Sequence, residues 1–173
     1  EEMVISSSIV SRVEDQVLSF AQERLWFIDQ YEGGTSTYNI PMMFRVSSDI
    51  DLGILENSIK AIVSRHEILR SLIRMDQEGK GYQYVLDDKE CPLNIRHVKV
   101  SNQSQLDKEL YREANYVYDL SKEYPIKVCI FELNNKKKRS VECYLSIVVH
   151  HIAFDGWSSD VFLKELQEHY KYY

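Results

Sequence analysis

Residues 150 to 156 read His-His-Ile-Ala-Phe-Asp-Gly and follow directly on an apolar run. The segment combines two adjacent imidazoles with a later carboxylate and a glycine directly after that carboxylate. A neutral imidazole titrates near pH 7 and can accept a proton from an attacking amine or hydroxyl without a large shift of its pKa. General base catalysis by a histidine is therefore the chemistry that this segment favours.

The two histidines are expected to have different roles. Side chains alternate between the two faces of a strand, so His150 and His151 at the end of one strand would point to opposite sides. Adjacent histidines in that arrangement cannot bind the same metal ion, which weakens the interpretation as a metal site. We predict that His151, which is nearer to the following loop, faces the reaction space as the general base. His150 is predicted to pack into the protein.

Asp155 and Gly156 each allow two roles. Asp155 would either orient His151, as the carboxylate of a catalytic triad does, or pair with an arginine and hold the loop in shape. The candidate arginines are Arg24, Arg65 and Arg70. Gly156 would permit either the close approach of a substrate to the backbone or a positive φ, and its amide would lie at the positive end of a helix.

A purely structural interpretation competes with this one. It takes His150 and His151 as hydrogen-bonded core histidines, and Asp155 and Gly156 as an ordinary turn into the last helix. The sequence contains no GxSxG elbow, P-loop or GxGxxG pattern, so neither a serine hydrolase nor a nucleotide-binding protein is supported. A serine after the glycine, Ser158 or Ser159, is better explained as a helix cap than as a nucleophile.

The elements that must position these residues follow from the periodicity of the apolar side chains. The sequence predicts an α/β layer structure without internal repeats, in which the last helix begins after Gly156. The other predicted helices cover 19–31, with Ser19 as the cap, 51–66 and 104–118. The predicted strands cover 38–46, 68–75, 81–86, 93–100, 126–133 and 141–149, with a polar hairpin loop at 134–139.

Composition and charge exclude several classes of function. A chain of 173 residues with 44% hydrophobic residues suits one folded domain, expected at 13–173 after an inter-domain linker at 1–12. A net charge of -6 disfavours binding to nucleic acid or to an anionic membrane, and no apolar run is long enough to span a membrane. Three cysteines without CxxC spacing predict reduced thiols in a cytoplasmic protein, with no metal site. The first residue is Glu1, which suggests a piece of a longer polypeptide.

Several segments resemble the signatures of one family, the condensation domains of nonribosomal peptide synthetases. The run from His150 to Ser159 resembles the family's active-site motif. Ser-Phe-Ala-Gln-Glu-Arg-Leu-Trp at 19–26 is similar to its first signature, and Arg-His-Glu-Ile-Leu-Arg-Ser at 65–71 is similar to its second. Asp-Leu-Ser at 119–121 with Pro-Ile-Lys at 125–127 resembles a further segment, although Lys127 stands where arginine is more usual.

This resemblance implies a fold and a reaction. The fold would be the N-terminal half of a domain built from two chloramphenicol-acetyltransferase-like halves, an α+β two-layer sandwich with a mixed sheet and flanking helices. The reaction would join an upstream aminoacyl or peptidyl thioester to the amine of a downstream aminoacyl thioester. His151 would position or deprotonate that amine, Asp155 would be mainly structural, and Gly156 would line the acceptor path.

The resemblance also implies partners and leaves alternatives. Substrates would arrive on the 4'-phosphopantetheine of upstream and downstream peptidyl carrier domains, and no cofactor would be bound directly. The other partners would be the C-terminal half and the adenylation domain of the same synthetase. The forms of 65–67 and 155–158 look most like the subclass that joins two L-configured residues. Ester-forming, cyclising and epimerising relatives remain alternatives, and the isolated half is expected to fold as an inactive scaffold or docking fragment.

Overall fold

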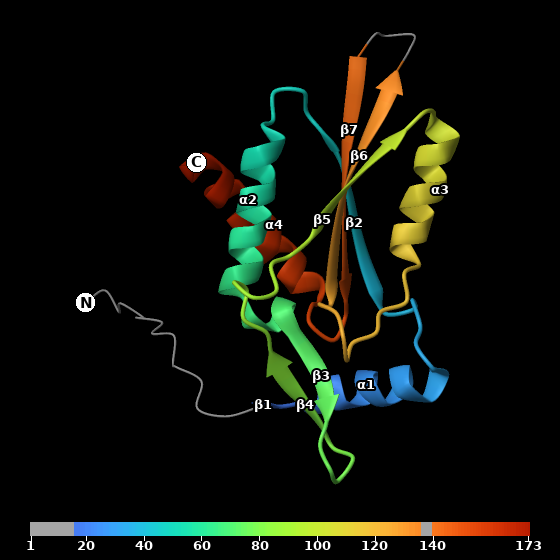
Figure 1. Ribbon diagram of the computed structural model, residues 1–173, viewed down its shortest axis with the longest axis vertical. Coiled ribbons are helices and arrows are strands. Elements are labelled where there is room, and N and C mark those ends of the chain that lie inside the picture. The colour runs from blue at the N-terminus through green and yellow to red at the C-terminus, as the bar shows by residue number, and fades with distance from the viewer. Residues whose placement is uncertain (1–15, 136–139) are drawn as a thin grey trace, which may run out of the picture.

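The computed structural model describes residues 16–135 and 140–173 (Figure 1). The predicted linker and most of the predicted hairpin loop lie outside these residues. The helices are α1 (Phe20–Glu32), α2 (Leu52–Arg65), α3 (Gln103–Ala114) and α4 (Gly156–Tyr172), with a 3-10 turn at Glu67–Arg70. The strands are β1 (Gln16–Val17), β2 (Asn39–Val46), β3 (Ser71–Met75), β4 (Gly81–Val85), β5 (Ile95–Val100), β6 (Ile126–Asn135) and β7 (Ser140–His150).

The main sheet is mixed, as the resemblance implies. Its strand order is β2-β7-β6-β5, in which β5 and β6 run parallel while β7 runs antiparallel to both of its neighbours. A smaller antiparallel sheet has the order β1-β4-β3. Figure 1 shows α2 and α4 on one side of the main sheet, α3 on the other, and α1 across the lower end.

The core follows the alternation of the strands. Leu145, Ile147 and Val149 of β7 pack in one cluster with residues of α2 and α4, whereas Val148 belongs to a second cluster. A third cluster joins α3 to β5 and β6 through Leu106 and Phe131. Helix α2 buries Leu55, Ile59, Ile62 and Val63, which recur every three or four positions along one face. No helix among the described residues is long and apolar enough to cross a membrane.

Helix α1 begins where the sequence predicts, but several of its large apolar side chains are exposed. Ser19 is the cap, and it exchanges capping-box hydrogen bonds with Gln22. However, Phe20 is 92% exposed and Tyr31 is 84% exposed, whereas Asp29 is buried. The helix lies across the end of the sheet rather than over its face, so only a narrow side of it contacts the rest of the chain. The apolar spacing that predicts this helix therefore does not show which of its apolar residues are buried.

Helix α3 ends earlier than the predicted limit at residue 118. Its last residue is Ala114, and Val117, inside the predicted range, is 49% exposed. The side chain of Asn39 explains the early end, because its amide nitrogen donates to the carbonyl oxygens of Ala114 (2.9 Å) and Tyr116 (2.7 Å). These bonds satisfy carbonyl groups that the end of a helix leaves free.

Candidate active site

The end of β7 and the turn into α4 position the whole motif. The backbone amide of His150 donates to the carbonyl of Pro125, and that of His151 donates to the carbonyl of Tyr38, both at 2.8 Å. The strand ends at His150, and the chain then turns so that the Ala153 amide donates to the His150 carbonyl at 3.0 Å. The two histidines are thus held by neighbouring strands on both sides of β7.

His150 lies in the interior with no exposed surface. Its Nδ1 accepts a hydrogen bond of 3.1 Å from the Ile152 amide, and the edge of the Tyr118 ring packs against it. This hydrogen bond places the proton of the neutral ring on Nε2. Burial lowers the pKa of His150 to about 4, with a smaller contribution from the charge of His151. His150 is therefore a neutral, packed imidazole at pH 7.

His151 is exposed and lines a hollow of about 580 Å³. The opposite wall of the hollow comes from α1, including Gln22, Arg24 and Leu25, and Tyr38 contributes to it from the segment before β2. Gln22 ties α1 to the motif, because its side-chain nitrogen donates to the Ile152 carbonyl at 3.1 Å. The described residues contain no group of three metal-ligating side chains. A proton acceptor facing an open hollow is the arrangement that general base catalysis requires.

Asp155 caps α4. Its Oδ1 accepts hydrogen bonds from the Ser158 amide (2.8 Å) and the Ser158 hydroxyl (2.7 Å), while the Asp155 amide donates to the Ser158 hydroxyl oxygen. The hydrogen bond from the Ser158 hydroxyl is the main reason why the pKa of Asp155 is lower than usual. The cap is thus Asp155 rather than the predicted Ser158 or Ser159. Ser158 instead completes the capping box from the third position of the helix.

The arginine pairing considered for Asp155 is not found among the described residues. Arg65 lies 4.0 Å from Glu165, and Arg70 lies 3.7 Å from Glu67 and also donates to backbone carbonyls. Arg24 lines the same hollow as Asp155 without an ion pair to it in the described part of the chain. Within the described part of the chain, no hydrogen bond joins Asp155 to His151. The carboxylate is turned toward its own helix, which explains why neither alternative appears.

Gly156 is the first residue of α4, and the positive φ considered for it is wrong. The glycines with a positive φ among the described residues are Gly33, Gly34 and Gly79. A Cβ built on Gly156 would meet no atom within 4 Å. The backbone at this position is therefore approachable from outside, which agrees with the other role considered for the glycine.

Asn39 is a residue of the site that the sequence did not single out. It is paired directly with His150 across the strands, and its amide holds the chain after α3. Its Oδ1 and the Nε2 of His150 are buried without a hydrogen-bond partner among the described residues. The available signal was an asparagine at the start of a strand, where such residues are uncommon.

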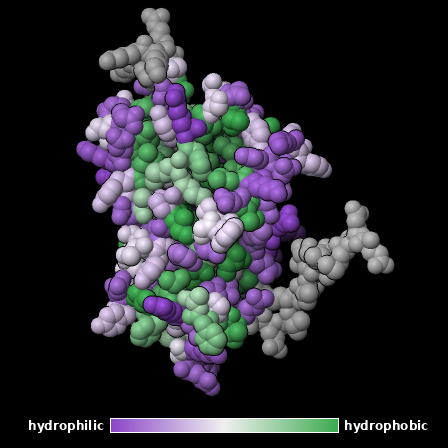
Figure 2. All heavy atoms as spheres, turned by 180° about the vertical axis from the view of Figure 1, so that it is seen from behind, coloured by the Kyte–Doolittle hydropathy of each residue, from purple (hydrophilic) through white to green (hydrophobic). Residues whose placement is uncertain are grey.

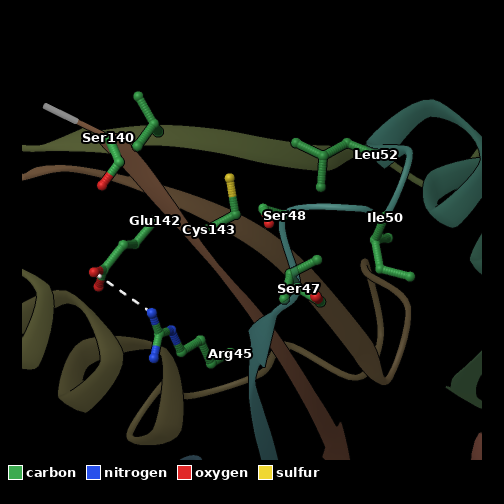
Figure 3. Close-up of a pocket in the computed structure, with 10 residues that line it drawn as sticks. Arg45, Ser47, Ser48, Ile50, Leu52, Ser140, Glu142 and Cys143 are labelled. Carbon is green, nitrogen blue, oxygen red and sulfur yellow. Dashed lines mark ion pairs between the residues drawn. The ribbon is translucent and has the colours of Figure 1, made fainter. Parts of the chain in front are cut away.

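A separate hollow of about 700 Å³ lies at the far end of β2 and β7 (Figure 3). An ion pair joins Arg45 to Glu142 across the two strands at 3.5 Å. Cys143 lines the same hollow, and burial raises the pKa of its thiol. A thiol with a raised pKa is a poor nucleophile, so this hollow does not compete with the motif as a reaction site.

We expect His150 to remain neutral down to about pH 4 in the folded protein. Because an unfolded chain protonates this imidazole near pH 6.5, stability falls as the pH drops from 6.5 towards 4, by on the order of 3 kcal/mol from this residue. Titration of the ring protons by NMR would measure the pKa directly. A His150→Gln variant should lose this part of the acid sensitivity in urea unfolding, and a midpoint near 6.5 for His150 would contradict the burial argument.

We expect Asp155→Ala to lower the urea midpoint, because the variant leaves the first turn of α4 uncapped. Asp155→Asn should retain most of the stability, since asparagine caps helices well. The depressed pKa means that the contribution of Asp155 is present above its usual value of 3.8 and is lost as the pH falls through the folded pKa. Equal midpoints for the alanine variant and the wild type at pH 7 would refute the capping role.

Comparisons with known proteins agree with this geometry. Residues 13–173 match the family model described as the condensation domain. The chain is 40% identical over 154 residues to N-(5-amino-5-carboxypentanoyl)-L-cysteinyl-D-valine synthase of Amycolatopsis lactamdurans, which covers 89% of the chain and 4% of that protein. It is 36% identical over 156 residues to the dimodular nonribosomal peptide synthase of Bacillus subtilis (strain 168), which covers 90% of the chain and 6% of that protein.

Solved structures give the same result for the fold. The X-domain from teicoplanin biosynthesis aligns with a TM-score of 0.78 at 28% identity, over 94% of this chain and 33% of that one. The first condensation domain of the CDA synthetase aligns with a TM-score of 0.76 at 20% identity, over 92% of this chain and 41% of that one. The described chain thus spans less than half of either structure. The chain belongs to the condensation domain family of nonribosomal peptide synthetases.

Proposed function

We propose that this chain is the N-terminal part of a condensation domain that forms peptide bonds between carrier-bound residues. The observation that carries the proposal is the exposed His151 in the hollow between α1 and the turn after β7. The donor would be an aminoacyl or peptidyl thioester on an upstream peptidyl carrier domain. The acceptor would be the amine of an aminoacyl thioester on a downstream carrier domain, and both would be linked through 4'-phosphopantetheine.

In the proposed reaction, the acceptor nitrogen attacks the carbonyl carbon of the donor thioester. A carbon–nitrogen bond forms, the carbon–sulfur bond breaks, and the departing phosphopantetheine thiolate receives a proton. An α-amine with a pKa of about 8 is partly neutral at pH 7, so His151 mainly positions the amine and takes up the proton released on attack. Holding the amine against the thioester supplies much of the acceleration.

The other motif residues support His151 from different sides. The neutral ring of His150 anchors the strand end beneath the turn, and the cap formed by Asp155 fixes where α4 begins. Gly156 leaves the space beside that helix end open, and we assign this space to the acceptor. Because Asp155 bonds to Ser158, we assign it a structural role at the start of α4.

Further partners follow from the exposed surface. Phe20, Phe27 and Tyr31 of α1 are largely exposed, and the last two rings stack on each other with centroids 6.5 Å apart. Aromatic residues gathered on one helix are typical of a contact surface. We assign this face to the C-terminal half of the condensation domain, and we place the adenylation domain of the same cytoplasmic synthetase further along the polypeptide.

Alternatives exist for the subclass of the reaction and for the activity of the chain by itself. The forms of residues 65–67 and 155–158 favour the subclass that joins two L-configured residues over ester-forming, cyclising or epimerising relatives. The chain by itself is a second candidate, as a scaffold or docking fragment without activity. The specific observation in its favour is that the hollow around His151, which α1, Tyr38, Ile68 and the turn after β7 line, is otherwise open to solvent.

We expect His151→Ala in the complete synthetase to remove most peptide bond formation while the protein still folds, because the imidazole is exposed and contributes little packing. Loss of a positioned general base typically costs about 10²- to 10⁴-fold in rate. The matched control is His97→Ala, another exposed histidine that pairs with Glu56 away from the motif. Mass spectrometry of products from loaded carrier domains provides the measurement. Wild-type turnover of the His151 variant would disprove the assignment.

We expect Gly156→Trp in the complete synthetase to block the acceptor while binding of the donor carrier is retained. The control is Gly156→Ala, because an added Cβ meets no atom within 4 Å and the alanine variant should fold normally. Carrier binding and product formation are measured separately for each loaded partner. If the tryptophan variant loses both substrates equally, the glycine does not line the acceptor path.

A further inference from the structure

A second cavity of about 300 Å³ lies next to the hollow that contains His151. It is a partly open cavity between the end of α2, the 3-10 turn and the first turns of α4. Its walls are mainly apolar, and they are formed by Ile62, Ile68, Leu69, Phe154, Val161 and Phe162. Figure 2 shows, on the side facing away from the viewer of Figure 1, hydrophobic residues along the middle of the molecule between hydrophilic margins.

The cavity and the hollow share part of their lining. Ile68, Ala153, Phe154, Asp155 and Ser158 contribute to both, so the turn after His151 forms the boundary between them. A molecule whose reacting atom contacts His151 therefore needs to cross only this boundary to enter the cavity. No other cavity found in the described residues shares lining with the hollow to this extent.

Several polar atoms at the cavity already have partners. His66 directs its Nε2 to Glu165 at 2.7 Å, and Asp155 and Ser158 bond to each other. A polar ligand group entering here would lose its bonds to water without gaining these protein groups, which costs free energy. An aliphatic or aromatic group, by contrast, gains by leaving water. The cavity therefore favours an apolar occupant.

We propose that this cavity binds the apolar side chain of the acceptor residue. The inference rests on the proposed function, in which the amine of the acceptor contacts His151. The carbon that carries this amine also carries the side chain, so an amine held at the imidazole keeps its side chain close to the shared boundary. The donor side chain is attached beyond the carbonyl carbon and starts further away. The cavity volume of about 300 Å³ accommodates a side chain of the size of leucine or phenylalanine.

The experiment changes Val161, which lines the cavity and is 53% exposed, so that substitution disturbs little of the core. In the complete synthetase, Val161→Trp adds a large side chain to the lining of the cavity, and Val161→Asp places a charge there at nearly constant size. The matched control is Val141→Trp, because Val141 is 55% exposed and lies at the far hollow. Downstream carrier domains are loaded with leucine or alanine, and upstream carrier domains are varied in the same way.

We expect the wild type to use the leucyl acceptor at least about 10-fold better than the alanyl acceptor in kcat/KM, since each methylene in an apolar pocket contributes about that much. Both Val161 variants should bring this ratio close to one while the alanyl acceptor is still used, and Val141→Trp should leave the ratio unchanged. A wild type that treats the two acceptors alike would overturn the inference. So would a ratio that follows the donor side chain.

A binding measurement separates this inference from the proposed function. Calorimetry with leucyl- and alanyl-pantetheine amides reports on the cavity whether or not a peptide forms. If the wild type forms no peptide from any pair, the proposed function fails. The cavity assignment then depends on whether both Val161 variants weaken binding of the leucyl compound selectively. Equal binding of the leucyl compound to the wild type and both variants would refute the assignment.

Discussion

The pairing of β2 with β7 is the constraint on which the geometry of the site depends. Eight residue pairs join the two strands, from Asn39 opposite His150 to Val46 opposite Cys143. A shift of this register by one residue would turn every side chain of β7 to the other face. His150 would then leave the interior, and the apolar residues that pack on α2 and α4 would face the other side of the sheet. The register and the burial of His150 therefore depend on each other.

Asn39 connects this strand pair to the rest of the fold. Its amide nitrogen donates to two carbonyl oxygens after α3, so the strand opposite His150 also fixes where α3 ends. This arrangement also costs stability, because Asn39 Oδ1 and His150 Nε2 are buried without hydrogen-bond partners among the described residues. Buried polar atoms without partners are destabilising, so their presence in a folded protein calls for an explanation such as a functional role. Here they lie directly beneath the turn that carries His151.

The sequence predicted the features that depend on local patterns. The alternation in β7, the cap of α1 at Ser19 and the inward face of α2 are local properties, and all three agree with the structure. The outward aromatic residues of α1 could not be predicted, since their exposure depends on where the helix lies relative to the sheet. The bonds of Asn39 to residues after α3 join positions far apart in the sequence, so no local pattern contained them.

Within the motif too, a local pattern predicted one feature and did not predict another. That adjacent histidines would differ in environment followed from alternation, whereas the direction of the Asp155 carboxylate depended on which hydrogen-bond partners were nearest. Both the Ser158 amide and its hydroxyl lie within 2.8 Å of the Asp155 carboxylate, and Ser158 is only three positions further along the chain. An ion pair between Asp155 and an arginine elsewhere in the sequence would have to replace these hydrogen bonds to Ser158. The capping box is the arrangement that forms, because it assembles with the helix itself and does not depend on the position of a distant segment.

The contrast between the two imidazoles has an electrostatic consequence for the proposed reaction. When His151 takes up a proton, a second charged imidazole next to it would oppose the uptake. Burial prevents this, because it lowers the pKa of His150 to about 4 and keeps that ring neutral at physiological pH. The carboxylate of Asp155 stays ionised through its bonds to Ser158 and adds a nearby negative charge. The fold thus keeps His150 neutral and Asp155 ionised on the two sides of His151.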